Sequence, residues 1–105
     1  MWHRAPWLID HGSALYFHHA NGWEQDAARA RAAFPAIKEH VLRTLASEIP
    51  EQDAVMAAAL TADVIDEILS LVPAQWGIDH AAYRRYFLDR LRAPRPFVEE
   101  AAGAR

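Results

Sequence analysis

Residues 61–72, TADVIDEILSLV, carry the clearest helical pattern in the sequence. Apolar side chains recur there at the three- and four-residue spacing of one helix face. They are Val64, Ile65, Ile68, Leu69 and Val72. Thr61 offers a hydroxyl to the first turn, and Asp63 and Asp66 place negative charge near the positive end of the helix dipole. Because Pro73 cannot continue the helix, the segment predicts an α-helix that starts at Thr61 and buries one apolar face.

Further helices are predicted on both sides of this segment. Their expected ranges are 24–33, 35–46, 51–60 and 79–93, with a last turn within 97–102. Pro35 suits a first helical position, Asp79 can cap the last long helix, and Pro94 ends it. The alanine-rich stretch 24–33 has too weak an apolar face to bury much. Helices therefore dominate the expected fold.

Each of the longer predicted helices has an expected buried face. For 35–46 this face holds Ile37, Val41, Leu42 and Leu45. For 51–60 it holds Val55, Met56 and Leu60, and for 79–93 it holds Tyr83, Phe87 and Leu91. The side chains expected to face outward from 79–93 are Arg84, Arg85, Asp89 and Arg92.

The amino-terminal residues predict a β-hairpin followed by a loop. Trp2-His3 and Trp7–Ile9 are aromatic or β-branched, and they flank Arg4-Ala5-Pro6, whose proline favours a turn. Asn21-Gly22 is a second turn signal. The expected architecture is a single mainly α domain over 1–105, with a hairpin remnant and loop at 1–23 and a helical part at 24–105.

Composition limits the classes of partner. The chain has a net charge of −3, and its 11 basic residues are scattered among 14 acidic ones without a basic block, so no nucleic-acid partner is expected. It contains no cysteine, and no stretch has the apolar length of a membrane span or the pattern of a signal peptide. We therefore expect a cytoplasmic protein without a membrane partner.

Asp10 is the candidate metal ligand. In WLIDHG, residues 7–12, it follows a short apolar run and precedes Gly12 by two positions. A carboxylate at the end of such a run can hold Mg²⁺ against a nucleotide in phosphoryl-transfer enzymes. The same pattern also describes an ordinary strand that ends in a turn. The local sequence leaves both interpretations open.

A histidine metal site is the weaker alternative. His11, His18 and His19 lie within nine residues of one another and close to Asp10. Zinc sites use such ligands, but adjacent histidines on an extended segment point to opposite faces. Loop hydrogen bonding explains these histidines more simply. The serines lack a Gly-x-Ser-x-Gly motif, so no catalytic triad is predicted.

Taken together, longer stretches resemble the HipA-like kinases, bacterial relatives of the protein and lipid kinases. WHRAPWLIDHGSALYFHH, residues 2–19, is similar to their metal-binding segment, where an Ile-Asp-His-Gly type motif replaces Asp-Phe-Gly. AFPAIKEHVL at 33–42, the Thr-x-x-Val-Ile step at 61–65 and YRRYFLDRLRAPRPFVEEA at 83–101 resemble the helical tail of one branch of this family. The resemblance covers nearly the whole chain.

The resemblance implies a fold and one site residue. The fold would be the C-terminal helical subdomain of a protein-kinase-like large lobe. Asp10 would be the Mg²⁺-coordinating aspartate, with Gly12 as a hinge and His11 as a packing position. Trp2 and Trp7 would belong to the hairpin at the floor of the nucleotide cleft, although simple core filling explains them better than a nucleotide contact does.

Other parts of a kinase site are missing from this sequence. Phosphoryl transfer needs a glycine loop, a lysine on the phosphates and a catalytic loop with aspartate and asparagine. The four glycines never cluster, and Lys38 and Asn21, the single residues of their types, both follow Asp10. We therefore expect no catalytic or nucleotide-binding residue in this chain, and Mg²⁺ and ATP binding only when an upstream kinase segment completes the site.

Several functions remain open at this level. The first is an inactive fragment of a HipA-like kinase, arising from a truncated or degenerate gene, or one half of a split kinase. The second is a free-standing helical protein-interaction module in which Asp10 is a relic. A small histidine-dependent metalloprotein is a third. The expected partners are an upstream kinase half or a second copy that pairs through an exposed hairpin edge.

Overall fold

The computed structural model describes residues 4–8, 15, 17 and 20–103, and this part of the chain is mainly α. Its α-helices are α1 (Ile49–Ala59), α2 (Ala62–Ser70), α3 (His80–Leu91) and α4 (Pro96–Gly103). Its 3-10 helices are η3 (Trp23–Gln25), η4 (Ala27–Arg31), η5 (Pro35–Glu39), η6 (Arg43–Leu45) and η7 (Ala74–Trp76). The predicted mainly α class is confirmed for these residues.

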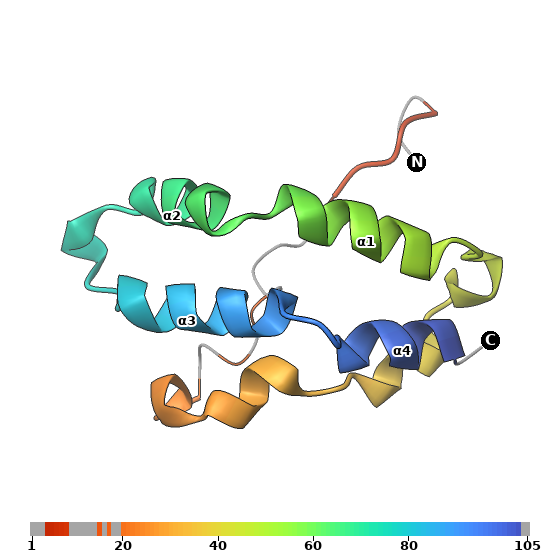
Figure 1. The fold of residues 1–105 in the computed structure, drawn as a ribbon, viewed down its shortest axis with the longest axis horizontal. Coiled ribbons are helices and arrows are strands. Elements are labelled where there is room, and N and C mark those ends of the chain that lie inside the picture. Colours follow the sequence, from red (N-terminus) through yellow and green to blue (C-terminus); the bar gives the residue numbers. More distant parts are fainter. Residues whose placement is uncertain (1–3, 9–14, 16, 18–19, 104–105) are drawn as a thin grey trace.

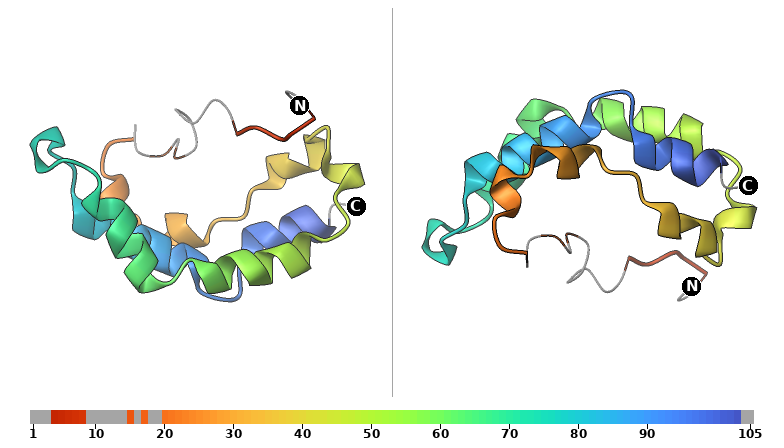
Figure 2. Two further views of the ribbon diagram at one scale, coloured as in Figure 1. Left: turned by 90° about the horizontal axis from the view of Figure 1, so that it is seen from above. Right: turned by 90° about the horizontal axis from the view of Figure 1, so that it is seen from below.

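The helices form two antiparallel arms. Figure 1 shows α1 and α2 in one row and α3 and α4 returning beneath them, so that α2 faces α3 and α1 faces α4. The 3-10 segments pack on the second row, with η4 against α3 and η5 against α4. Viewed from above, the α-helices curve into an arc, and η4 and η5 lie on its inner side (Figure 2).

Helix α2 agrees closely with its prediction. The Thr61 hydroxyl oxygen accepts a hydrogen bond from the Val64 amide at 3.3 Å, which satisfies one free donor of the first turn. Ile65 and Leu69, four residues apart, are buried, whereas Ile68 is largely exposed. The helix therefore buries a narrower face than the sequence pattern predicted.

Helix α3 also begins where the sequence predicted. The Asp79 carboxylate accepts a hydrogen bond from the Ala82 amide at 3.0 Å. A carboxylate at this position both satisfies a backbone donor and opposes the positive end of the helix dipole. Of the residues expected to face outward, Arg84 pairs with Asp66 of α2 at 2.6 Å and Arg85 donates to the Glu24 carbonyl at 3.1 Å.

Substitution of this cap tests its role in the fold. We expect Asp79→Ala to lower the free energy of unfolding by about 1 kcal/mol, because the Ala82 amide loses its acceptor. Urea denaturation followed by circular dichroism measures the change. Asp79→Asn, which retains a side-chain acceptor, is expected to recover most of the loss. An alanine variant as stable as the wild type would show that the cap contributes nothing.

The predicted helix at 35–46 is wrong. The chain forms the two short 3-10 helices η5 and η6 instead. Val41 and Leu45 of the expected buried stripe are 85% and 77% exposed. A helix in a protein is stabilised mainly by burial of its apolar face. No surface of the described residues covers the apolar face that was expected at 35–46.

Two neighbouring predictions also need correction. The stretch expected to form a helix at 24–33 forms η3 and η4. Helix α1 starts at Ile49 rather than 51, because Pro50 lies in its first turn, where proline is tolerated. Val55 and Met56 of α1 are exposed rather than buried. Alanines surround these two residues, so the helix has no single strongly apolar face.

The predicted hairpin is not seen in the described residues. Residues 4–8 contain no strand, and Trp7 and Leu8 are exposed. A strand needs a neighbour to accept and donate its backbone hydrogen bonds, and no strand among the described residues offers one. Trp2, His3 and Ile9, the other residues of the expected arms, lie outside the described residues. At the other end, α4 is a full helix rather than a single turn.

An aromatic cluster forms the centre of the core. Trp23 is 7% exposed, and its ring lies 5.1 Å from Phe17, 4.7 Å from Tyr83 and 6.4 Å from Tyr86 between ring centroids. The other buried apolar residues described are Phe17, Ala30, Ile65, Leu69 and Ala82. This core is small for a chain of 105 residues.

Arginine side chains join segments that are distant in sequence. Arg95 donates to both oxygens of Asp53 at 2.6 to 2.9 Å and to the Leu91 carbonyl at 2.7 Å. These contacts connect α4 to α1 and to the end of α3. Arg31 of η4 donates to the Asp89 carbonyl at 2.6 Å and also to the carbonyl of Pro94. Positive charge at this position suits the negative end of the α3 dipole.

The molecule exposes more surface than a compact monomer of its mass. Its solvent-accessible area is 8101 Å², whereas a folded 11.9-kDa chain is expected to expose about 6,000 Å². The radius of gyration is 15.3 Å, compared with about 13 Å for a compact domain of this length. Among the described residues, no helix has both the length and the apolar character needed to cross a membrane.

Candidate functional site

The residues predicted from the sequence as a metal site lie outside the described residues. This applies to Asp10, to the neighbouring His11 and Gly12, and to His18 and His19. The assignment of Mg²⁺ to Asp10 therefore stays a prediction. Within the described residues, no three histidine, aspartate or glutamate side chains lie together as metal ligands do. Trp7, expected near the nucleotide cleft or in the core, is 64% exposed.

The two other residues that bear on a kinase site are described. Lys38 of η5 pairs with Glu100 of α4 at 3.0 Å, so its ammonium group connects two surface segments. Asn21 precedes Gly22, whose φ of 75° lies in the left-handed region that glycine adopts without strain. The Gln25 amide donates to the Gly22 carbonyl at 3.2 Å. The predicted turn at Asn21-Gly22 is confirmed.

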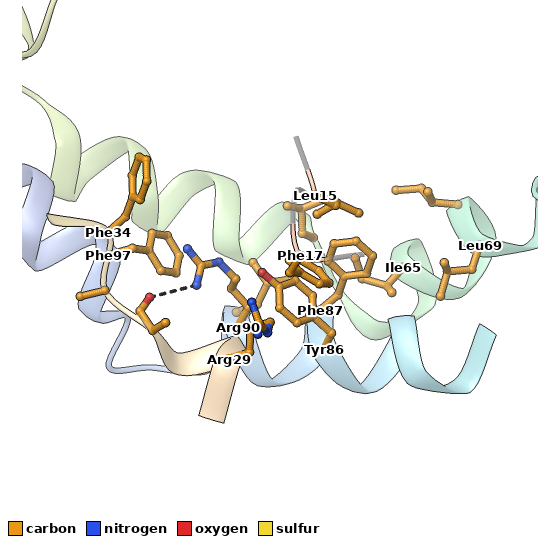
Figure 3. Close-up of a pocket in the computed structure, with 15 residues that line it drawn as sticks. Leu15, Phe17, Arg29, Phe34, Ile65, Leu69, Tyr86, Phe87, Arg90 and Phe97 are labelled. Carbon is orange, nitrogen blue, oxygen red and sulfur yellow. Dashed lines mark hydrogen bonds between the residues drawn. The ribbon is translucent and has the colours of Figure 1, made fainter. Parts of the chain in front are cut away.

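A cavity lies between the α-helices and the segments η4 and η5. It has a volume of about 630 Å³, within the range of pockets that bind small molecules. Figure 3 shows its wall. Its lining residues are Leu15, Phe17, Arg29, Ala32, Ala33, Phe34, Leu60, Ile65, Ile68, Leu69, Tyr86, Phe87, Arg90, Leu91 and Phe97.

Helical periodicity explains how α2 and α3 contribute to this wall. Ile65 and Leu69 are one turn apart on α2, and Tyr86 and Arg90 are one turn apart on α3. These residues therefore point to the same side of their helices. Phe97 in the first turn of α4 extends the wall beyond the end of α3. The cavity depends on how the two helical arms pack.

Among the described residues of the wall, arginine is the only charged type. Arg90 is held by the protein itself, since its Nη1 donates to the carbonyls of Ala30 at 3.2 Å and Ala32 at 3.1 Å. Its guanidinium carbon also lies 3.9 Å from the centroid of the Phe97 ring, a cation–π contact. Arg90 is therefore a structural part of the wall.

Arg29 is less completely paired. Its Nη2 lies 3.5 Å from Asp26 Oδ2, three residues earlier in the chain. Its Nε is buried and has no hydrogen-bond partner among the described residues. A buried donor without an acceptor is unfavourable by about 1–3 kcal/mol in general. Arg29 is therefore the less completely hydrogen-bonded of the two arginines in this wall.

The chemistry of the wall favours binding over catalysis. In the part of the chain that the structure describes, the lining residues include no carboxylate, histidine, serine or cysteine, so they offer neither a nucleophile nor an acid–base pair. Tyr83, in the adjacent aromatic cluster, has a pKa raised by burial and secondarily by the Glu24 carboxylate. Its phenol therefore remains protonated at neutral pH.

Sequence reasoning did not find this cavity. Phe87 was expected on a buried helix face and Phe97 in the last turn, Phe34 had no expected role, and Arg29 lay in a stretch with little apolar character. Their proximity depends on contacts between η4 and α3, which are far apart in the sequence. The sequence does offer one signal for this cavity: arginines and aromatic residues occur together in two stretches, 29–34 and 86–97.

No family model, no curated protein and no solved structure matches this chain.

Proposed function

We propose that this chain is the helical C-terminal part of a HipA-like kinase, carrying the Mg²⁺-binding aspartate Asp10, and that it does not transfer phosphoryl groups by itself. Its resemblance to that family at 2–19, 33–42 and 83–101 supports the proposal. A helical fold agrees with the helical subdomain expected of a kinase large lobe. Mg²⁺ and ATP would bind only after another kinase segment completes the site.

The proposal that this chain needs a partner rests mainly on its exposed apolar surface. The accessible area exceeds that of a compact monomer by about 2,000 Å². Permanent interfaces bury roughly 2,000–5,000 Å² in total, so an area of this size suits a stable complex. Large apolar side chains are exposed at both ends of the helical arc. They include Leu42, Leu45, Val55, Met56, Leu71 and Trp76.

A free-standing helical protein-interaction module is the second candidate function. It is favoured by the short stretch Val41–Leu45, which exposes Val41, Leu42 and Leu45 together. Contiguous apolar patches on a protein surface mark interaction sites. In this case the protein would bind its partner without any contribution from Asp10. The two candidates therefore differ in whether Asp10 matters once the partner is bound.

Titration of the isolated chain with ATP and Mg²⁺ tests the first candidate. We expect no affinity tighter than about millimolar, because a single carboxylate offers too few contacts without a phosphate-binding loop and lysine. Isothermal titration calorimetry on the wild type and on Asp10→Ala measures this. Micromolar binding that is lost in Asp10→Ala would contradict the expectation, since the chain would then hold a complete nucleotide site.

A further inference from the structure

The cavity between the two helical arms has the features of a binding site for a small amphipathic molecule. Its walls are formed by apolar and aromatic side chains from α2, α3, α4 and the 3-10 segments, and arginine is the only charged component among its described residues. In Figure 3, Phe34 and Phe97 lie at one end, Ile65 and Leu69 lie at the other, and Arg29 and Arg90 lie between them. Apolar walls around one fixed polar group are typical of ligand pockets.

We propose that this cavity binds an aliphatic monocarboxylate, with the alkyl chain against the apolar wall and the carboxylate at Arg29. The volume of about 630 Å³ is sufficient for a medium-length alkyl chain. Transfer of the chain from water to this wall supplies the favourable apolar term. No carboxylate is found among the described lining residues, so an acidic ligand meets no like charge in this part of the wall.

Arg29 determines the preference for an acid. Its Nε is buried and unpaired in the described structure, and its Nη2 makes only a 3.5 Å contact with Asp26. Because Nε is closed to solvent, a ligand carboxylate would meet the guanidinium at its outer Nη groups, in a charge-assisted hydrogen bond shorter than the present 3.5 Å contact with Asp26. Arg90 is less suited to this role, because its Nη1 is held by the carbonyls of Ala30 and Ala32 and its guanidinium lies on the Phe97 ring.

A small ligand explains the wall better than a peptide from a protein partner does. An extended peptide needs backbone donors and acceptors at its sides, and the described lining consists of apolar or aromatic side chains and two arginines. The concave arrangement of side chains from several elements instead encloses a compact molecule. This inference is tested at residues of the cavity and not at Asp10, so its outcome is separate from that of the proposed kinase ancestry.

Binding of three matched probes to the full chain tests the proposal. Decanoate, decanol and decyltrimethylammonium carry similar alkyl chains with negative, neutral and positive head groups, and they are used below their micelle concentrations. We expect decanoate to bind about tenfold more tightly than decanol and the cation to bind most weakly. Methyl NMR spectra should show shifts at Ile65 and Leu69. Equal affinities for the three probes, or shifts elsewhere in the protein, would overturn the proposal.

Variants separate the head-group contact from the apolar wall. Arg29→Gln should weaken the binding of decanoate by about tenfold and leave the binding of decanol unchanged. Asp26→Asn should strengthen the binding of decanoate about two- to threefold, because it releases Arg29 from its ion pair. Arg92→Gln is the matched control, because Arg92 also pairs with an aspartate three residues away, Asp89 at 3.9 Å, but lies outside the cavity. Decanoate binding that is unchanged in Arg29→Gln would refute the role of Arg29.

Filling the cavity provides a test that does not depend on charge. Ala33 lines the cavity and is exposed, so Ala33→Trp places a large ring in the space without disturbing a buried residue. We expect circular dichroism to show that this variant folds normally, and we expect it to bind neither decanoate nor decanol. Retained binding would place the ligand elsewhere. If an amphipathic peptide of leucine and glutamate shifts Ile65 and Leu69 while decanoate does not, the cavity serves a protein partner and the proposal fails.

Discussion

Replacement of Trp23 by alanine is expected to destabilise the protein by about 3–5 kcal/mol, the largest effect of any single substitution considered. The Trp23 ring contacts Phe17, Tyr83 and Tyr86 and is 7% exposed. Removal of the ring leaves a void and weakens the packing of η3 and η4 against α3. Proteins of this size have only about 5–15 kcal/mol of total stability. The variant should therefore be partly unfolded at 37 °C.

Urea denaturation monitored by circular dichroism measures this loss. The matched control is Trp76→Ala, because Trp76 of η7 has the same side chain but is 70% exposed. We expect the control to change the free energy of unfolding by no more than about 0.5 kcal/mol. If both variants were equally stable, the aromatic cluster around Trp23 would not be the centre of the core.

Loss of the Arg95–Asp53 pair is expected to have the second largest effect. Arg95 is bidentate to Asp53, and the two side chains are only 15% and 19% exposed. This pair connects α4 to α1, and the Asp53 hydrogen bond raises the pKa of Arg95 further above its ordinary value. We expect Arg95→Met to lower Tm by roughly 5–10 °C, because Asp53 then remains partly buried without its partner.

A double-mutant cycle isolates the interaction between the two side chains. Arg95→Met combined with Asp53→Leu should lower Tm by less than the sum of the single variants, since the double variant leaves no unpaired charge. Arg84 and Asp66 form a pair of similar geometry at 2.6 Å that is about half exposed, so Arg84→Met serves as the control and should change Tm little. Additive effects in the cycle would show that Arg95 and Asp53 act separately.

Local signals predicted the parts of the fold that depend on local interactions. The caps Thr61 and Asp79 form hydrogen bonds within three residues, so the starts of α2 and α3 follow directly from the sequence. The segment 35–46 failed because its apolar spacing matches a helix while no described surface covers Val41 and Leu45. Periodicity states which side chains share a face but not whether another element lies against it.

The candidate sites show the same division between local and distant information. Asp10 was found from a short motif and a resemblance, both readable along the chain, and it lies outside the described residues. The cavity wall combines Arg29 with Phe87 and Phe97, which are nearly 60 residues or more away in sequence. Contacts between such distant segments cannot be derived from the periodicity of either one.

The state of association of the purified chain tests the central claim most directly, namely that another polypeptide must cover its exposed apolar surface. Sedimentation velocity across a range of concentrations measures it. We predict concentration-dependent self-association, which Leu42→Ser combined with Leu45→Ser should weaken, because both leucines are exposed in the structure. A chain that stays monomeric at every concentration, and that binds no hydrophobic dye, would contradict the claim.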